Sequence, residues 1–314
     1  MREFKYGYHD STNKPVTILN FNEKKSLTGT ASQKWCLFRL LPFMIGDFVP
    51  EGTPIWKLYL TCREVADIVF APVIAKGWLP HLKQVTVELN EMYAEVSKTF
   101  PAKFHFITHY HRLIQEYGSL RNFWCLRFEA KHQTLKKIAT HSRNYINIEK
   151  TIGDRHQYLQ CYDLINFSNL KEGTKTKCNK IAVSDLPNEH LISLQTHCDF
   201  NEIENVWSCR SVTMGHITYV VNSIIVLETD FDLDVPIFGQ IHQIIYNSYK
   251  YFVICKLLKT RIFKEHLHAY EVEFTNSVYS FTFHNQPLDF QHLDLYEFRG
   301  KRYVTLKYRS HSRV

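Results

Sequence analysis

The stretch FGQIHQIIYNSYKYFVICKL, residues 238–257, predicts two antiparallel strands joined by a tight turn. Its two apolar runs, Phe238–Tyr246 and Tyr249–Leu257, are rich in Ile, Val, Tyr and Phe, and Asn247-Ser248 lies between them. β-branched and aromatic residues favour strands, and a short polar pair between two such runs favours a turn. This part of the chain is therefore expected to be built from β-structure.

Four similar segments flank this pair and extend the β-rich region over residues 206–314. They are His216–Leu227, Ala269–Phe274, Val278–Phe283 and Arg302–Lys307. Arg299-Gly300 predicts a second tight turn. Six short strands in about a hundred residues favour a small antiparallel barrel or sandwich.

Residues 1–165 have a different, helical pattern. Apolar residues recur every three or four positions in Ile55–Val73 and Leu79–Phe100, and the segments Phe104–Tyr117 and Trp124–His141 predict further helices. Another helix is expected to start near Gln33 with Ser32 as its N-cap and to stop at Pro42 or soon after. Gly118 is expected to be a C-cap or turn.

Residues 166–205 are polar and predict a linker with a short helix near Glu189–Leu194. The fold class is therefore predicted to be α+β.

Composition excludes several classes of protein. The 45% hydrophobic and 22% charged residues permit a packed core. Neither a dinucleotide fingerprint nor a phosphate-binding P-loop occurs among the 11 Gly, so no small-molecule substrate is indicated. The most apolar stretch, Val65–Ile74, is interrupted by Asp67 and Pro72, so no membrane contact is expected.

Cysteine usage favours an intracellular protein, and the charge is compatible with an anionic partner. The formal net charge of +7 suits nucleic acid without requiring it. Met1–Lys14 is polar and contains no secretory leader. The 8 Cys are scattered and none are spaced as C-x-x-C, which favours reduced thiols inside a cell.

Glu129 is the candidate site residue, within the motif WCLRFEAKH at Trp124–His132. In a helix, one face would pack inward through Phe128, Leu135, Ile138 and Ala139. Glu129 would lie on the neighbouring face. It would lack the usual i, i+4 ion-pair partner, because the residue four positions further along is Gln133 and not a base. Glu129 is therefore either a surface charge near Arg127, Lys131 and Lys136 or a metal ligand.

The sequence KFHFITHYHRLIQEY at 103–117, followed by Gly118 and the Glu129 motif, resembles the last characteristic block of CACTA-type (En/Spm-like) DNA transposases and their animal relatives. The chain departs from that block at three positions, His111, Ser119 and Leu126. The resemblance continues upstream in Tyr8–Asp10, Ala31–Leu37 and Asp67–Val73, and downstream in Pro236–Gly239 and His268–Glu271.

The resemblance implies a catalytic core with an RNase H-like fold, in which three acids bind Mg²⁺ or Mn²⁺ for two-metal phosphoryl transfer. Glu129 matches the third acid, on the helix that follows a long helical insertion. The first two acids lie upstream of the Tyr8–Pro15 match, so this chain is expected to lack them along with the core strands. The acids that it does contain match insertion or lead-in positions: Asp10, Asp47, Glu64 and Asp67. The implied protein is a transposase-derived fragment, expected in the nucleus and without catalysis by itself.

Basic residues near Glu129 could contact DNA, as the resemblance implies, or could form a solvated helix face. Those expected to contact phosphates are Lys131, Lys136, Lys137 and Arg143. A second basic set, at Lys256, Lys259, Arg261 and Lys264, and the basic segment Arg299–Arg313 could equally be solvated surface. A protein partner or an oligomer is also compatible with the sequence.

Two further functions stay open on the sequence alone. In one, the chain is a metal-dependent transposase or nuclease whose missing acids come from Asp67 or from a partner chain. In the other, it is a domesticated chromatin or protein-interaction module with an exposed aromatic pocket formed by Tyr246, Tyr249, Tyr251 and Phe252.

Zinc sites are weaker alternatives. His105 and His109 are spaced i, i+4, and His111 is nearby, but packed or hydrogen-bonded histidines are the favoured interpretation. A second set, Cys198, Cys209, His197 and His216, fits no zinc spacing that we recognise, and separate buried thiols are favoured there.

Overall fold

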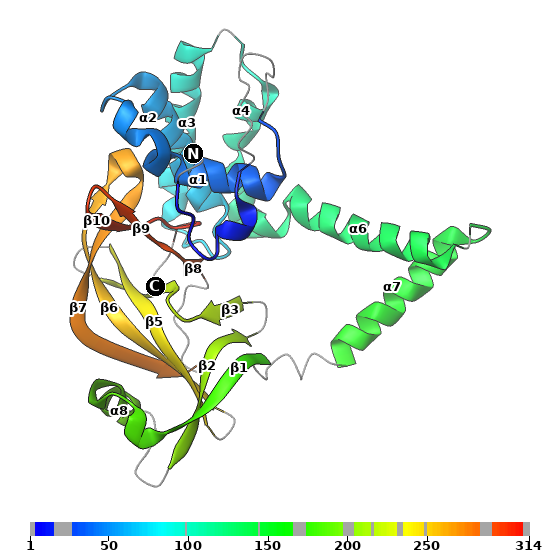
Figure 1. Cartoon of the computed structure of the whole chain (residues 1–314). Coiled ribbons are helices and arrows are strands. Elements are labelled where there is room, and N and C mark those ends of the chain that lie inside the picture. The colour runs from blue at the N-terminus through cyan, green and yellow to red at the C-terminus, as the bar shows by residue number, and fades with distance from the viewer. Residues whose placement is uncertain are drawn as a thin grey trace.

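The computed structural model describes residues 4–15, 27–97, 99–143, 145–165, 174–196, 204–214, 217–230, 235–247, 250–282 and 291–309. Figure 1 shows helices α1 to α5 gathered at one end, a curled sheet below them, and helices α6 and α7 projecting to one side. The chain is α+β, with helices in its N-terminal half and an antiparallel sheet in its C-terminal half, as predicted.

The helices of the N-terminal half are α1 (Ala31–Ile45), α2 (Pro54–Val69), α3 (Trp78–Val96), α4 (Ala102–Ile107), α5 (Tyr110–Tyr117), α6 (Cys125–Ser142) and α7 (Ile148–Ile165). The helix predicted over Phe104–Tyr117 is two helices, because a turn at Thr108 and His109 separates α4 from α5. Gly118 is the C-cap of α5, as predicted, and its φ of +80° is readily adopted by glycine.

The start of α1 differs from the prediction. Thr30, not Ser32, is the N-cap: its hydroxyl accepts a hydrogen bond from the Gln33 backbone N–H at 3.3 Å, and the Gln33 side chain accepts one from the Thr30 N–H at 2.9 Å. This capping box satisfies two backbone donors at once. The helix was predicted to stop at Pro42 or soon after, and it ends three residues later, at Ile45, with Pro42 inside its last turn.

Within the described residues, ten strands form one antiparallel sheet in the order β1-β2-β5-β6-β7-β10-β9, with β3 paired to β2 and β4 paired to β5 and β8. The strands are β1 (Thr174–Ala182), β2 (Asn205–Met214), β3 (Ile217–Val220), β4 (Ile224–Asp230), β5 (Val235–Asn247), β6 (Lys250–Lys264), β7 (Ala269–Thr282), β8 (His292–Leu293), β9 (Leu295–Phe298) and β10 (Lys301–Val304).

Strand β6 shows why the apolar run at its start forms a central strand. Tyr251, Val253 and Cys255 point to one face and pack with the core of the curled sheet. Phe252 and Ile254 point to the other face and pack against α8 (Asn188–Gln195). Because successive side chains alternate between two covered faces, the strand is buried at five consecutive positions.

The predicted strands are confirmed in position and corrected in length. The two segments predicted at Ala269–Phe274 and Val278–Phe283 belong to one long strand, β7, and the segment predicted at His216–Leu227 is divided between β3 and β4. The turn at Arg299-Gly300 is confirmed, and both residues have positive φ, +50° and +72°. That pair of angles is the one a two-residue turn between antiparallel strands requires. Ser248, in the other predicted turn, lies outside the described residues.

The segment predicted as a linker, 166–205, contains both strand and helix. β1 pairs with β2 along its length, from Thr174↔Thr213 to Ala182↔Asn205. The short helix predicted near Glu189–Leu194 is α8, and it packs on β6 and β7. The polar composition of β1 fits its place at one end of the sheet, where one edge is not paired to a described strand.

The two halves of the chain share a hydrophobic core. Cys36, Leu40 and Phe43 of α1 pack with Tyr296 of β9 and Tyr303 of β10. Buried polar contacts also cross the boundary, since the Arg63 guanidinium donates a hydrogen bond to the Leu306 carbonyl at 2.5 Å. None of the helices described here is long and apolar enough to cross a bilayer.

Candidate nucleic-acid interface

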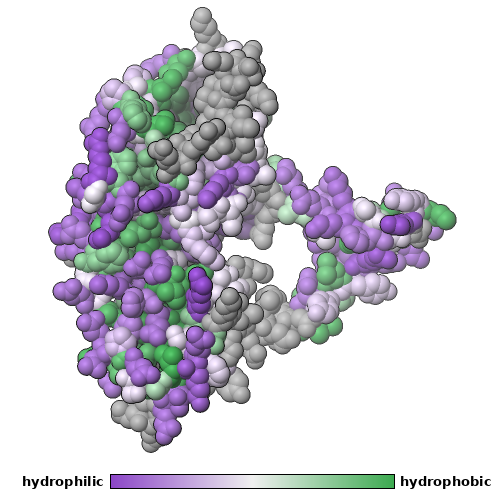
Figure 2. All heavy atoms as spheres, viewed as in Figure 1, coloured by the Kyte–Doolittle hydropathy of each residue, from purple (hydrophilic) through white to green (hydrophobic). Residues whose placement is uncertain are grey.

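Helices α6 and α7 form an arm that stands away from the rest of the molecule (Figure 1). The arm leaves the helical body at Trp124, the N-cap of α6, and turns back at Arg143, whose φ of +48° ends the helix. None of the described side chains of α6 or α7 is buried. Figure 2 shows mainly hydrophilic residues over α6. The arm is therefore held mainly by contact between its two helices.

The predicted inward face of α6 is wrong. Phe128 is 65% exposed, and Leu135, Ile138 and Ala139 are only half-buried. The periodicity correctly predicts a helix, but the body that this face was expected to pack against does not reach the arm (Figure 1).

Glu129 and the predicted phosphate-binding residues all lie on the arm. Glu129 is exposed, as are the basic residues Lys131, Lys136, Lys137 and Arg143. The segment 125–143 contains five Lys or Arg residues and a single acid, Glu129. The segment 125–143 thus carries an excess of positive charge, and such a surface can bind phosphates by releasing their counterions.

The other acids considered as metal ligands each belong to a separate ion pair. Asp10 pairs with Arg39, Asp47 with Arg299 at 2.7 Å, and Glu64 with His81 at 2.7 Å. No group of three or more His, Cys, Asp or Glu side chains that could bind a metal is found in the part of the chain that the structure describes.

Asp67, the acid proposed to complete a metal site with Glu129, is held inside the protein. One of its carboxylate oxygens lies 3.0 Å from the Arg63 guanidinium, and the other lies 2.8 Å from His268 Nε2. Its side chain is 10% exposed, whereas Glu129 is at the surface of the arm. The geometry therefore favours a structural role for Asp67.

His105 and His109, which sequence reasoning favoured as packed or hydrogen-bonded rather than zinc-binding, contact each other as a pair. His105 and His109 lie on either side of the break between α4 and α5, and their Nε2 atoms are 3.3 Å apart. His105 is exposed and His109 is half-exposed, and a hydrogen bond between the two rings accounts for the contact.

The prediction that Cys198 and Cys209 are separate buried thiols can be compared with the structure only at Cys209. Cys198, His197 and His216 lie outside the described residues. Cys209 is not a separate thiol, because it forms a disulfide with Cys178 at opposed positions on β2 and β1.

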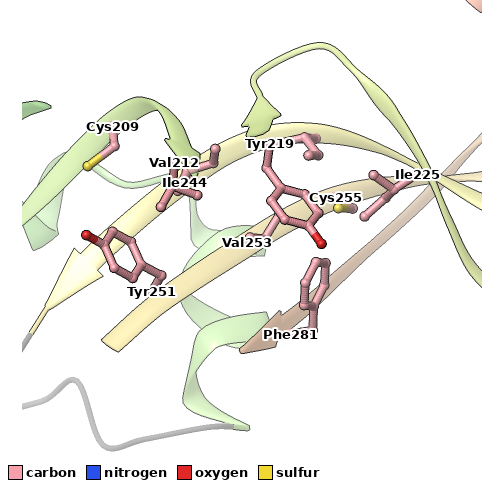
Figure 3. Packing of buried hydrophobic residues seen from close by; sticks show 10 residues of the cluster. Cys209, Val212, Tyr219, Ile225, Ile244, Tyr251, Val253, Cys255 and Phe281 are labelled. Carbon is pink, nitrogen blue, oxygen red and sulfur yellow. The ribbon is translucent and has the colours of Figure 1, made fainter. Parts of the chain in front are cut away.

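Two of the four aromatic residues suggested for an exposed pocket in the β-rich half, Tyr251 and Phe252, are buried in its core. Figure 3 shows Tyr251 lying among the buried side chains of the sheet. It is 8% exposed and Phe252 is 2% exposed, while Tyr246 packs against the same core from its edge. Tyr249 lies outside the described residues. These rings therefore give no support to an exposed aromatic pocket.

The second basic set is partly neutralised. Arg261 on β6 pairs with Glu273 on β7, and Lys256 lies 5.7 Å from the Phe274 ring centre. Lys259 is exposed and Lys264 is half-exposed. Compared with the arm, this surface presents fewer cations that an incoming phosphate could bind.

A buried cluster of charged groups near the base of the arm was not predicted. The Arg39 guanidinium pairs with Asp10, and the Tyr296 hydroxyl donates a hydrogen bond to the same carboxylate at 2.5 Å. Burial alone would raise the pKa of Asp10, but the Arg39 charge and these hydrogen bonds lower it. One signal was present in the sequence: Arg39 interrupts the apolar run of α1, and a charge at such a position needs a buried partner.

Four more titratable groups surround this pair. Burial, followed by the Asp10 charge, raises the pKa of Asp294 to about 6. Burial, followed by the Lys307 charge, lowers the pKa of His9 to about 4 and that of His292 to about 3. Burial, followed by the Arg39 charge, lowers the pKa of Lys307 to about 8.

Comparison of this chain with protein-family models, with curated proteins and with solved structures gave no match.

Proposed function

We propose that this chain is a transposase-derived protein that binds nucleic acid through the α6–α7 arm. The observation that carries the proposal is the exposed α6 segment, with five basic residues against one acid. Because the described cations of this segment face solvent and are not committed to the fold, binding would be electrostatic and tolerant of sequence. A DNA-binding role would place the protein in the nucleus.

In this proposal, α2 to α5 correspond to the helical insertion of an RNase H-like transposase, and α6 corresponds to the last core helix. Glu129 would be the third acid of a metal site, with Mg²⁺ or Mn²⁺ held only if two further acids were supplied from outside the described residues. Its exposure on α6 leaves it accessible to such a partner. A carboxylate is a suitable oxygen ligand for either ion.

The arm is tested by removing its charges. A variant with Lys131, Lys136, Lys137 and Arg143 all changed to Gln should bind a short DNA duplex at least about tenfold more weakly at low salt. The slope of log affinity against log salt should flatten by up to about 0.9 for each phosphate that the variant no longer neutralises. Fluorescence anisotropy across a salt series measures both quantities. The four side chains are exposed, so the melting temperature should not change.

The matched control removes the same total charge from the body. Lys57, Lys83, Lys103 and Lys250 are exposed and lie outside the arm, and a variant with all four changed to Gln should keep most of the affinity. Equal losses in the two variants would mean that only net charge matters and would contradict the assignment to the arm.

Catalysis is tested separately. Incubation of the chain with supercoiled DNA and Mg²⁺ or Mn²⁺ should leave the DNA intact, because one acid cannot hold the two ions that phosphoryl transfer uses. Cleavage that disappears in Glu129→Gln would overturn the inactive part of the proposal, and cleavage that persists in that variant would indicate a contaminating nuclease.

A further inference from the structure

A pocket of about 920 Å³ opens beside the base of the arm. Its walls come from the N-terminal segment around Tyr8–Asn13, from α1, from the residues just before α6, and from the C-terminal residues Lys307 and Tyr308. This volume is within the range of pockets that bind small organic ligands.

One wall of the pocket is aromatic. The rings of Trp35 and Phe70 meet edge to face with centroids 4.7 Å apart, and Phe70 meets Trp124 in the same way at 5.5 Å. All three residues line the pocket and are half-buried, so ring surface remains available to a flat ligand. Stacking on such rings is the sequence-tolerant way in which proteins hold unpaired bases.

Part of the pocket lining is cationic. The Arg121 guanidinium lies 5.6 Å from the Trp124 ring centre and 5.3 Å from that of Tyr308. Lys34, Arg39 and Lys307 also line the pocket, and the single lining acid, Asp10, is already paired with Arg39. Three lining cations thus remain outside the ion pairs found among the described residues. An anionic group on the ligand would balance them.

Buried donors in the walls point to an acceptor as well. Trp124 Nε1 and Arg39 Nε are buried without a hydrogen-bond partner among the described residues. Both atoms can only donate, and leaving a buried donor unpaired is unfavourable. Phosphate and base carbonyl oxygens are acceptors that could pair with these donors.

We infer that the pocket binds one unpaired nucleotide, with its base against Trp35, Phe70 and Trp124 and its phosphate beside Arg121 and Lys307. The inference deepens the proposed function and rests on it for the source of the ligand, because Trp124 is both a wall of the pocket and the N-cap of α6. A strand lying along α6 would therefore reach the pocket with its end. A free nucleotide has the same chemistry and is the other source.

Protonation of Lys307 supplies an independent readout. Its amine interacts electrostatically with Arg39 and Cys36 of α1, with His9 and Asp10 of the N-terminal segment, and with His292 and Asp294 near the last strands. Burial, followed by the Arg39 charge, lowers its pKa to about 8. A bound phosphate favours the charged amine, so binding should take up protons and strengthen as the pH falls from about 9 to about 7. Lys307→Gln should remove this part of the pH dependence.

The direct experiment compares three probes: a blunt duplex, the same duplex with a short single-stranded overhang, and a nucleoside monophosphate. Trp35 and Trp124 supply a fluorescence signal in the wild-type chain. The overhang should raise affinity about 5- to 150-fold over the blunt duplex, the range expected for one stacked base. Arg121→Gln and Trp124→Leu should each remove most of that preference and keep blunt-duplex binding. Lys259→Gln, which removes an exposed charge on β6, is the matched control and should keep the preference.

The outcomes separate the two proposals. If the monophosphate quenches Trp fluorescence but no duplex binds, the arm proposal fails and the pocket stands with a free nucleotide as its ligand. If duplexes bind without preference for the overhang and the monophosphate causes no quenching, the pocket inference is overturned and the arm proposal stands. Since Trp124→Leu could disturb packing, Arg121→Gln decides the matter where that variant loses its folded circular-dichroism signal.

Discussion

Replacing Arg39 with Met is expected to lower the free energy of unfolding by about 3–5 kcal/mol at neutral pH, the usual cost of breaking a buried ion pair. The Arg39 and Asp10 side chains are 2% and 6% exposed. Without the guanidinium, the Asp10 carboxylate would stay buried with the Tyr296 hydroxyl as its main remaining donor. One hydrogen bond cannot replace the lost hydration of a charge.

The double variant with Asp10→Asn and Arg39→Met distinguishes charge from packing. With both charges removed, no uncompensated ion remains, and the loss should shrink to about 1–2 kcal/mol. Urea unfolding, followed by circular dichroism, of the wild type, Asp10→Asn, Arg39→Met and the double variant gives the coupling energy of the pair. Losses that simply add would show that Arg39 acts through its bulk, which would contradict the electrostatic account.

Acidification between about pH 6 and pH 4 is expected to destabilise the protein through the groups around this pair. His9 and His292 have pKa values lowered to about 4 and about 3 in the fold, so their stabilising contribution is present above the ordinary histidine pKa and is lost as the pH falls. Asp294, with its pKa raised to about 6, acts in the opposite direction, since its contribution is greatest at low pH and is lost as the pH rises through 6.

The size of this destabilisation depends on how many protons the unfolded chain binds beyond those bound by the folded chain. In this pH range the unfolded chain protonates both histidines, whereas the folded chain protonates only Asp294. The difference of one proton lowers the free energy of unfolding by at most about 1.4 kcal/mol per pH unit of acidification. Both histidine rings are partly exposed, so solvent screening makes the observed slope smaller.

Two variants make the sign testable. Asp294→Asn removes the opposing group, so the slope of the free energy of unfolding against pH should increase towards the value for a difference of two protons. His292→Phe removes one of the two histidines and should bring the slope due to this cluster near zero. Urea titrations at several pH values measure each slope. Identical slopes in the two variants would show that the cluster does not control acid stability.

The residue pattern of a segment predicted a strand where the types of its own residues determine the structure. The run at Tyr251–Cys255 was recognisable as a strand because β-branched and aromatic residues dominate it, and the alternation of its side chains suits two covered faces. Strand β1 was not recognisable, since its Lys, Thr and Asn residues are typical of a linker and only its pairing with β2 makes it a strand.

Burial depends on what lies opposite a residue, and the sequence of one helix does not contain that information. Phe128 has the spacing of a core residue but belongs to an arm with no neighbouring surface to cover it. For the candidate interface, the sequence predicted the basic residues of α6 and their exposure to a partner. It did not predict the pocket beside them, because Trp124 and Tyr308 are far apart along the chain.

The hydrogen bond between Asp10 and Tyr296 joins residues separated by 286 positions. During synthesis at about 5–20 residues per second, on the order of 15–60 s would pass between the appearance of the two side chains. Throughout that interval Arg39 and Asp10 would lack the last strands that cover them. Nascent chains released before β9 should therefore be recognised by chaperones, even though most of the helical half has already been made.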